Sequence, residues 1–562
     1  MLLSNLNILA TAPGGVAKLR ELILTLAMQG KLVPQDPKDE PASELLKKIR
    51  AEKDRLVAEG KIKRAKPLAE ITADEKPFEL PAGWEWARLD DVSIAIVDCP
   101  HSTAKFVSNG LLCIDTNSFK NGKLVPHKLR YVEEATFADR IARLQPQPGD
   151  LVFAREGSVG ESVIIPDGVN ACLGQRVMLF RFSKRVSNEF VRMTISSKAF
   201  VDKLLALHKG IGAKHVNVGD MRLALVPLPP LAEQSRIVTS VEELMRLCDA
   251  LEAKGQLEAT QHAQLVSTLL VTLTASETPE ELADNWQRVA THFGLLLDRP
   301  EAVDALEQTI LQLAVRGLLV PQDPQDEPAS ELLKKIRVEK DRLIAEGKIK
   351  RDKPLPPIAV DEQPFNLPAG WAWARFPELG EFGRGKSKHR PRNDPSLFDP
   401  PKYPLIQTGE VSRAKGVVKE AHSYYSDLGL AQSRLWPKGT LCITIAANIA
   451  ESAILGFDSC FPDSVVGFVP ADAMGNVEYF LQFVETAKAN LLAFAPATAQ
   501  KNINLEILSS LLIPLPPLTE LTRIVARVAS LRALCADLRQ RLADLQSVQA
   551  RLAEELVASV AA

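Results

Sequence analysis

Residues 30–88 read GKLVPQDPKDEPASELLKKIRAEKDRLVAEGKIKRAKPLAEITADEKPFELPAGWEWAR, and residues 317–375 read GLLVPQDPQDEPASELLKKIRVEKDRLIAEGKIKRDKPLPPIAVDEQPFNLPAGWAWAR. The two stretches differ at 12 of 59 positions, and each residue of the second lies 287 positions after its counterpart. The same offset separates VPLPPL at 226–231 from IPLPPL at 513–518. This period is far longer than the roughly 20–50 residues of solenoids and propellers. The chain is therefore built from two half-molecules.

The segments between these repeated blocks are not repeated. Residues 89–225 and 376–512 share only scattered matches, such as Asn217 with Asn504. This alternation predicts one scaffold that carries two different variable domains. Each variable segment has short β-rich runs followed by helical stretches, which indicates an α/β domain of about 140 residues. The expected strands are 150–153, 162–165, 177–182 and 441–445, and the expected helices are 188–207 and 477–493.

Length and composition exclude several classes of protein. A chain of 562 residues is too long for one hydrophobic core, because cores stop growing near about 250–300 residues. The formal net charge of -2 gives no overall basic field. No apolar run approaches the roughly 20 residues of a membrane helix, and the N-terminus lacks the basic start of a secretory signal. Seven cysteines without a CxxC pair argue against a disulfide framework or a zinc site. We expect a cytoplasmic protein without membrane contact and without a metal site.

The segment after each PLPPL motif has apolar residues at alternating spacings of four and three. This pattern predicts a long helix with a coiled-coil seam, so two long helices are expected to pair as an antiparallel coiled coil. The alternative is that each helix packs on its own neighbouring domain. Ser43 is expected to cap a charged helix that ends at Gly60. The predicted seam residues are Ile237, Val241, Leu244, Leu251 and Leu265 in the first half, and Ile524, Val528, Leu531, Leu538, Leu542 and Leu545 in the second.

Local charge points to candidate nucleic-acid contacts in both variable segments. Residues 98–224 contain 18 Lys/Arg against 12 Asp/Glu, and residues 384–392 contain five basic residues among nine. Loops with Arg and Lys beside Gly and Pro suit contacts with phosphates and guanine edges, although a solvated loop with balanced charge would look similar. The candidates are Arg155, Lys209, Lys214 and His215, with Arg384, Lys386, Lys388, Arg390 and Arg392.

Catalytic motifs are mostly absent from the sequence. GEFGRGKS at 380–387 formally matches the phosphate-binding GxxxxGK[ST] pattern. A true P-loop leads into a helix whose N-terminus holds phosphate, and Pro391 and Pro395 oppose a helix here. We find no HExxH or GxSxG, so a scaffold with two recognition domains is expected, without a catalytic centre.

The chain resembles the DNA-specificity (S) subunits of Type I restriction–modification enzymes. The resemblance is carried by VPLPPLAEQSRIV at 226–238 with its copy from 513, and by the duplicated LVPQDP at 32–37 and LPAGWEW at 80–86. It covers essentially the whole chain. The segment QKNIN at 500–504 is similar to one that precedes the family's second conserved region, with a weaker counterpart KHVN at 214–217. These segments add Asn217, Gln500, Lys501 and Asn504 to the candidate DNA contacts.

The resemblance implies an α+β fold in which long conserved helices separate two target-recognition domains in a pseudo-two-fold internal repeat. Each domain would read one half of a split, asymmetric DNA target. The helices would dock two methyltransferase subunits, and nuclease subunits would complete the complex. S-adenosylmethionine, ATP and Mg would be held by these partners and none by this non-catalytic chain. The implied regions are an N-terminal region 1–83, recognition domains 84–230 and 371–517, a central region 231–370 and a C-terminal helix 518–562.

Two other functions stay open from the sequence. One is a structural adaptor whose variable domains bind proteins. The other is a self-contained enzyme that uses the P-loop-like segment, in which case Lys386 would be needed for ATP turnover.

Overall fold

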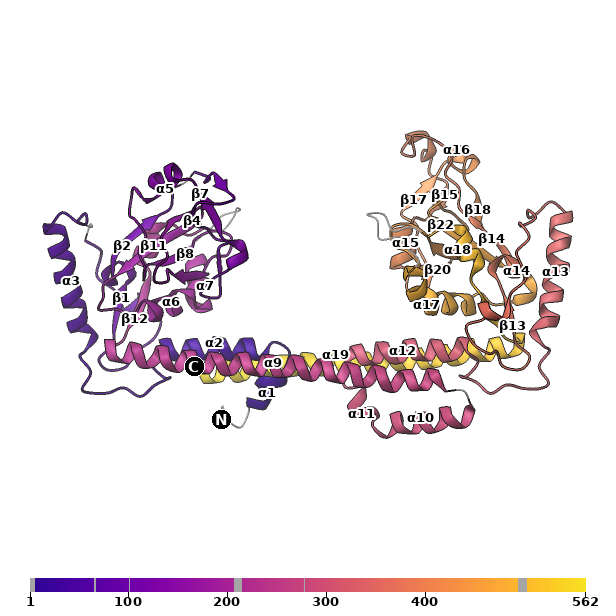
Figure 1. Ribbon diagram of the computed structural model, residues 1–562, viewed down its shortest axis with the longest axis horizontal. Coiled ribbons are helices and arrows are strands. Elements are labelled where there is room, and N and C mark those ends of the chain that lie inside the picture. The colour runs from indigo at the N-terminus through magenta and orange to yellow at the C-terminus, as the bar shows by residue number, and fades with distance from the viewer. Residues whose placement is uncertain are drawn as a thin grey trace. The chain divides into compact units, whose positions relative to one another are not determined.

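The computed structural model divides the chain into two compact units (Figure 1). The first unit contains Met1–Glu258 and Gln546–Ala562, and the second contains Ala259–Leu545. In each unit a variable domain adjoins a bundle of helices. We call residues 84–230 the first head and residues 371–517 the second head. The described residues are 6–561 except 65–66, 101, 207–214, 277 and 494–502.

The first head contains two four-stranded sheets. The main sheet has the order β2-β11-β8-β9 and is antiparallel throughout. The second sheet has the order β10-β4-β7-β3, and β4 pairs parallel with β10 but antiparallel with β7. The strands are β2 (Ser93–Asp98), β3 (Phe106–Val107), β4 (Leu111–Ile114), β7 (Arg130–Val132), β8 (Leu151–Ala154), β9 (Ser162–Ile164), β10 (Ala171–Leu173) and β11 (Val177–Phe182), with the hairpin β5 (Phe119–Lys120) and β6 (Lys123–Leu124).

The second head repeats this topology. Its main sheet has the order β14-β22-β19-β20-β16, and in its second sheet β15 pairs parallel with β21 and antiparallel with β17. The strands are β14 (Gly380–Arg384), β15 (Tyr403–Leu405), β16 (Val417–Val418), β17 (Ser423–Tyr425), β18 (Leu435–Trp436), β19 (Leu441–Thr444), β20 (Ser452–Leu455), β21 (Ser459–Cys460) and β22 (Val465–Pro470).

The two heads therefore share a fold although their sequences do not match, which confirms the expected α/β domain in each variable segment and the pseudo-two-fold repeat. The strands β2-β11-β8-β9 of one main sheet correspond in order to β14-β22-β19-β20 of the other, and β8 and β19 are both buried along their whole length. The differences lie at the edges: β16 extends the main sheet of the second head, and β3 and β18 extend the second sheets of the first and second head. A buried strand requires only apolar side chains of suitable size, so sequence identity can be lost while the sheet is kept.

Short helices complete each head. The predicted helix 188–207 is two helices, because Ser197 ends the first one. The helices of the first head are α4 (Leu89–Val92), α5 (Glu134–Ile141), α6 (Asn188–Ser196), α7 (Lys198–Ala206) and α8 (Val218–Leu223). Those of the second are α14 (Phe376–Leu379), α15 (Thr408–Arg413), α16 (Asp427–Ala431), α17 (Glu478–Ala493) and α18 (Leu505–Ser510).

The ends of each head are joined by a two-stranded antiparallel ribbon. In the first head β1 (Glu85–Arg88) pairs with β12 (Leu225–Leu228), and in the second β13 (Ala372–Ala374) pairs with β23 (Ile513–Leu515). The repeated Trp-x-Trp and PLPPL motifs form these ribbons. Each head therefore begins and ends at one place, next to the long helix that follows it.

The two long helices are α9 (Leu231–Ala275) and α19 (Leu518–Ala561). Helix α9 begins in the first unit and ends in the second, whereas α19 runs in the opposite sense. In the first unit they share a core with α2 (Gly15–Met28), in which Ile237 and Val241 lie with Ala553. In the second they share a core with α12 (Pro300–Val315). Each bundle thus has three helices, one more than the coiled-coil pattern predicted.

The third helix changes which residues are buried. Leu265 and Leu545, expected in the seam, are both 52% exposed, whereas Val266 and Leu270 are buried. A helix that packs against two neighbours must bury a wider face than a two-stranded seam provides. The other predicted seam residues lie in the cores or pack against them. Ile237, Val241, Ile524 and Val528 are buried, and Leu244, Leu251, Leu531, Leu538 and Leu542 are partly buried.

Two matching charged helices, α3 (Ala42–Ala58) and α13 (Ala329–Ala345), stand beside the heads (Figure 1). The expectation that Ser43 caps α3 is wrong, because the helix begins at Ala42 with Pro41 as its N-cap, so Ser43 lies inside the first turn. The amide of Ala42 donates instead to the carbonyl of Gly83 (2.8 Å). Helices α1 (Leu6–Thr11), α10 (Pro279–Thr291) and α11 (Phe293–Leu296) complete the scaffold. Within the described residues, no helix is long and apolar enough to cross a membrane.

Candidate nucleic-acid interface

A buried glutamate at the start of each long helix holds the repeated motifs together. In the first unit Glu233 is 1% exposed. It accepts hydrogen bonds from Trp84 Nε1 (3.0 Å) and Gln35 Nε2 (3.2 Å). Burial raises the pKa of Glu233. The LVPQDP, LPAGW and PLPPLAEQ segments thus meet at one carboxylate, which anchors the head to α9. The same contacts recur in the second unit among Glu520, Trp371 (3.0 Å) and Gln322 (3.1 Å).

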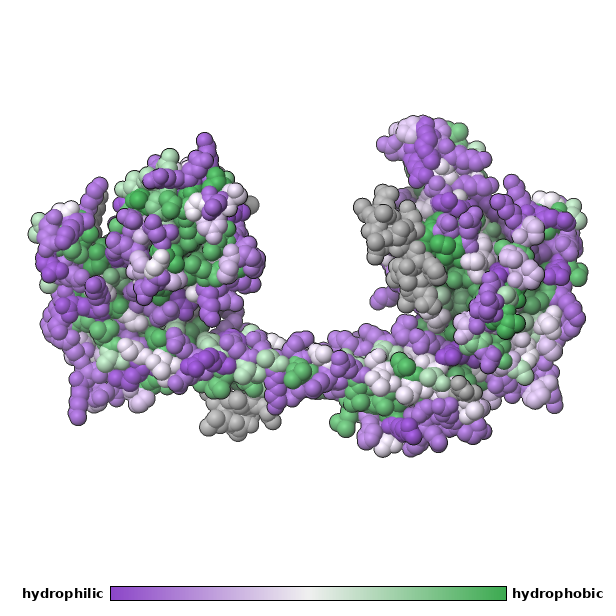
Figure 2. All heavy atoms as spheres, in the orientation of Figure 1, coloured by the Kyte–Doolittle hydropathy of each residue, from purple (hydrophilic) through white to green (hydrophobic). Residues whose placement is uncertain are grey.

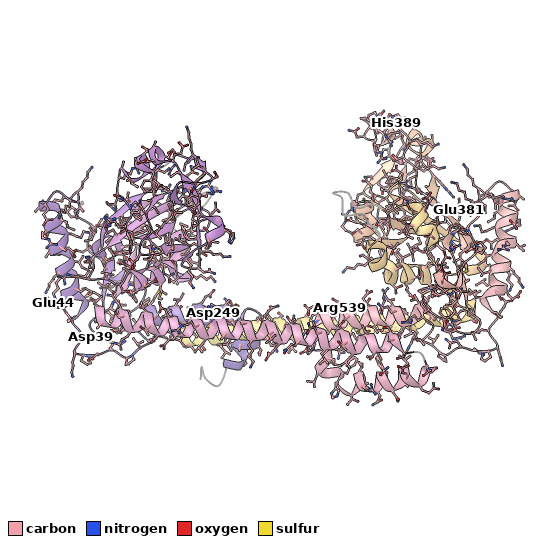
Figure 3. The ribbon with its side chains drawn as sticks, viewed as in Figure 1. Asp39, Glu44, Asp249, Glu381, His389 and Arg539 are labelled. Carbon is pink, nitrogen blue, oxygen red and sulfur yellow. The ribbon has the colours of Figure 1, made fainter. Side chains whose placement is uncertain are left out.

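Ion pairs reinforce both anchors. Arg236 pairs with Asp39 (2.7 Å), and the equivalent Arg523 pairs with Asp326 (2.8 Å). The hydrogen bond from Arg523 lowers the pKa of Asp326. These charged contacts tie the turn before α3 or α13 to the first turns of the long helix. Figure 3 labels Asp39 at this turn. The repeated LVPQDP, LPAGW and PLPPL motifs are therefore explained by packing within each unit.

A second set of ion pairs joins the bundle helices. In the first unit Arg20 on α2 pairs with Asp249 on α9 (2.6 Å). In the second unit Arg539 on α19 pairs with Asp304 (2.6 Å) and Glu307 (2.9 Å) of α12. Asp249 and Arg539 are labelled on their helices in Figure 3. The third helix of each bundle is thus fixed by charge as well as by apolar packing.

The basic loop of the second head, residues 384–392, begins at the last residue of β14. Three of its five Lys and Arg side chains form hydrogen bonds or ion pairs within the protein. Arg384 donates to the carbonyl of Asp463 (2.6 and 2.9 Å), and Arg392 pairs with the Asp463 carboxylate (3.0 Å). Arg390 donates to the carbonyls of Ser387 (2.7 Å) and His389 (2.8 Å). These contacts fix the path of the loop. Contact between these arginines and DNA stays a prediction.

Lys386 and Lys388 are the other two cations of this loop, and both are exposed. Their backbones are held, because the Lys386 amide donates to the Phe461 carbonyl (3.2 Å) and the Lys388 amide to Gln432 Oε1 (2.6 Å). Their ammonium groups form no hydrogen bond or ion pair with any described residue. His389 lies in this loop (Figure 3), in a region whose surface is largely hydrophilic (Figure 2).

The P-loop-like segment is not built as a P-loop. Its first five residues, Gly380–Arg384, form strand β14 along β22. The chain then continues without helix as far as the 3-10 turn Pro395–Leu397. A helix N-terminus, which would hold the phosphates, does not follow Ser387.

Arg155 in the first head lies at the end of β8 and is engaged internally. Its guanidinium pairs with Asp98 at the end of β2 (3.0 Å), and its side chain is only 13% exposed. The Arg155 carbonyl accepts a hydrogen bond from the Val216 amide (2.8 Å). In the second head the Ile445 carbonyl accepts the matching hydrogen bond from the Ile503 amide (3.1 Å), so Ile445 occupies the place of Arg155. The ion pair of Arg155 is thus particular to the first head.

The matched asparagines Asn217 and Asn504 each cap a short helix. Asn217 Oδ1 accepts from the Asp220 amide (2.9 Å) at the start of α8, and Asn504 Oδ1 accepts from the Ile507 amide (2.8 Å) at the start of α18. This capping explains their presence at equivalent positions. His215 is exposed beside Asn217. Lys209, Lys214, Gln500 and Lys501 lie outside the described residues.

Sequence reasoning missed two exposed basic groups next to the main sheets. One is Lys120 and Lys123 on the β5–β6 hairpin, and the other is Arg413, Lys415 and Lys419 around β16. In the first head the sequence KNGK at 120–123 could have identified the hairpin, because Asn-Gly between short β-prone runs predicts a tight turn. The second group had no comparable local signal.

Comparisons with known proteins agree on one family. The family model of the Type I restriction modification DNA specificity domain matches twice, at residues 82–261 and 368–545. The EcoEI specificity subunit of Escherichia coli, a Type I restriction enzyme, is 36% identical over 96% of this chain and 93% of that protein. The EcoAI specificity subunit of Escherichia coli is 44% identical over 66% of this chain and 63% of that protein. The crystal structure of the HsdS subunit from Thermoanaerobacter tengcongensis is 19% identical, covers 86% of this chain and 98% of that chain, and has a TM-score of 0.41.

Proposed function

We propose a function from the premise that this chain belongs to the family of Type I restriction–modification DNA-specificity proteins, as its two matching domains and its relatives show. The chain is the DNA-recognition subunit of a Type I restriction–modification complex. Each head reads one half of a split target in double-stranded DNA. The helices α9 and α19 connect the heads and determine the number of base pairs between the two halves.

The observation that carries this function is the repeat of one head fold with two different surfaces. Both heads have the same sheet order and the same glutamate anchor to a long helix. Their loops differ in length, charge and structure. Sequence is read by side chains that contact base edges, so two unlike surfaces select two unlike half-targets. Because the two heads differ, the target is asymmetric.

The scaffold offers the same surface twice, which suits two copies of one partner. Helices α3 and α13 match closely in sequence and expose mostly charged faces, with ion pairs such as Lys47–Glu44 and Lys334–Glu331. We assign two methyltransferase subunits to these repeated surfaces, and nuclease–translocase subunits join that assembly. This chain supplies recognition without catalysis. The S-adenosylmethionine, ATP and Mg that the reactions need belong to the partner subunits.

Selection from random duplexes tests this function. The complex of this chain with its methyltransferase subunits is expected to enrich two short, unlike elements at a fixed spacing. Enrichment of a palindromic target would contradict the reading by two different heads. If no sequence is enriched, the alternative of a protein-binding adaptor is favoured.

Lys386→Ala/Lys388→Ala is expected to weaken binding of the selected duplex by this complex. If both ammonium groups contact phosphates, the slope of log K against log salt falls by about 1.8, because each contact contributes about 0.9. Binding is measured by titration at several salt concentrations. The control is Lys438→Ala. Lys438 precedes the first residue of β19, whereas the basic loop lies near the last residue of that strand. Unchanged affinity and slope in the double variant would remove this loop from the DNA interface.

A further inference from the structure

We infer that each head carries an additional phosphate-binding surface beside the fourth strand of its main sheet, formed by Lys120 and Lys123 next to β9 in the first head and by Arg413, Lys415 and Lys419 next to β20 in the second. The inference rests on the proposed function, since it names further groups that hold the DNA. It assigns these residues to the sugar–phosphate backbone and not to base edges.

The first surface is a tight hairpin that places two lysines side by side. Lys120 and Lys123 are direct cross-strand partners in β5 and β6. The turn residues Asn121 (φ 50°) and Gly122 (φ 77°) both have the positive φ that a two-residue hairpin turn of this hand requires. The Asn121 amide donates to Glu161 Oε2 (2.8 Å), which fixes the turn to the loop before β9. The hairpin is thus held in place by the main sheet.

The lysine pair is unfavourable in the unbound protein. Like charges directly opposite each other on neighbouring strands destabilise a sheet. Both side chains are exposed, and neither ammonium pairs with a carboxylate in the part of the chain that the structure describes. By contrast, the charged helix α3 balances Lys47 with Glu44 at 2.6 Å. A bound anion would remove the repulsion that the hairpin geometry imposes.

The second surface surrounds a shallow hollow of roughly 320 Å³ in the second head. Arg413 ends α15, Lys415 precedes Gly416 (φ 88°), and Lys419 follows β16. All three cations are exposed and line the hollow. Helix α15 packs beside β20 (Figure 1). The cations are therefore carried by segments that pack against or pair with the main sheet.

The carboxylates at this hollow do not cancel its charge. Glu410 is engaged locally, because its Oε2 accepts from the Gln407 amide (3.1 Å) and its Oε1 lies 3.7 Å from His422 Nδ1. Glu420 also lines the hollow and is exposed. None of the three cations forms an ion pair with a described residue. The three positive charges thus exceed the two carboxylates, of which one already caps a helix.

The two surfaces occupy the same place in the shared fold. Gly122 forms a parallel bridge with Val163 of β9, and Val417 pairs parallel with Ile454 of β20. Strands β9 and β20 are equivalent, since each occupies the fourth position in its main sheet, after β2-β11-β8 or β14-β22-β19. A hairpin supplies the cations in one head, and a helix end with a short strand supplies them in the other. Positive charge is thus retained here although backbone and sequence both differ.

These features favour phosphates over base edges. Phosphates are the component common to both halves of the target, and a feature common to both heads fits a common ligand. Four of the five cations are lysines, which bind phosphate as point charges on flexible stems, whereas base reading depends on fixed, bidentate groups. The surfaces would therefore place each head on the duplex, and other loops would select the sequence.

Lys120→Ala/Lys123→Ala in the complex with its methyltransferase subunits tests the inference on the selected duplex and on a scrambled duplex. We expect the salt slope to fall by about 1.8 and the affinity at 0.1 M salt to fall roughly tenfold or more on both duplexes. The ratio of the two affinities is expected to stay unchanged. Arg413→Ala/Lys419→Ala should give the same result in the second head.

The control variant is Lys184→Ala/Arg185→Ala, which removes two exposed charges that follow β11. These residues lie at one end of the main sheet, and the loop before β9 that holds the hairpin lies at the opposite end. This variant should leave affinity and slope unchanged. If the Lys120/Lys123 variant keeps the wild-type slope while the wild-type complex selects its target, the inference is wrong and the proposed function stands. A fall in the affinity ratio would also overturn it, because the residues would then read bases. If the wild-type complex itself does not discriminate between the duplexes, the proposed function fails first.

Discussion

Trp371→Ala is expected to lower the free energy of unfolding of the second unit by about 3–5 kcal/mol, while the first unit keeps its stability. Trp371 is buried, and its indole packs into the core that joins the second head to the start of α19. Truncation leaves a cavity and removes the Nε1 hydrogen bond to Glu520 (3.0 Å). A buried carboxylate then loses one of its two donors, which adds to the cost.

Hydrogen exchange measures this effect with a control in the same molecule. The amides of β13 and β23, next to Trp371, should exchange at least a hundredfold faster, because every 1.4 kcal/mol is a factor of about ten. The equivalent amides of β1 and β12 in the first unit, where Trp84 is intact, should exchange at the wild-type rate. Equal protection in both ribbons would show that the glutamate anchors do not hold the heads.

The pH dependence follows from the same carboxylate. Burial raises the pKa of Glu520 above its usual value of 4.5, and the hydrogen bonds from Gln322 and Trp371 oppose this rise. A carboxyl with the higher pKa in the folded state binds more protons when folded. Stability therefore falls as the pH rises from about 4.5 through the folded pKa. Trp371→Phe removes the indole donor and should raise the folded pKa further, so the fall should extend to higher pH.

The scaffold could be predicted from the sequence because its signals are repeated and periodic. The offset of 287 residues and the spacing from Ile524 to Leu542 indicated two half-molecules and two long helices. The third helix of each bundle was not predicted as a partner, because the periodicity of one helix shows that a face is buried but not what covers it. For that reason Leu265 was placed in the seam, although it is half exposed.

An α/β domain was expected in each variable segment, but the strand order that the two heads share could not be predicted. Paired strands such as β8 and β19 require apolar side chains in general, so their sequences retain no match that a reader could align. The functions of single polar residues were also hidden. Asn217 and Asn504 proved to be helix caps, and Arg155 proved to be paired with Asp98. Such roles depend on which partner the fold brings near, which local sequence does not state.

Inserting one heptad into each long helix is expected to lengthen the preferred spacing of the split target. The insertions follow Glu258 in α9 and Leu545 in α19, where the two units divide. Seven residues preserve the apolar register and add about 10.5 Å of helix at about 1.5 Å per residue. Because base pairs rise by about 3.4 Å, this length corresponds to about three base pairs.

A single insertion is the matched control for this variant. With seven residues added to α9 alone, the packed faces of the two helices no longer correspond. The complex should then lose most of its affinity for every spacing. The double insertion should restore binding, which separates an effect on spacing from an effect on folding.

The most direct measurement is therefore selection of random duplexes by the wild-type complex and by the double-insertion complex. We expect both complexes to select the same two unlike elements, with a gap between them that is about three base pairs longer for the variant. Selection of the same two elements at the original gap would contradict this expectation, because the helices would then not determine the distance between the two halves of the target.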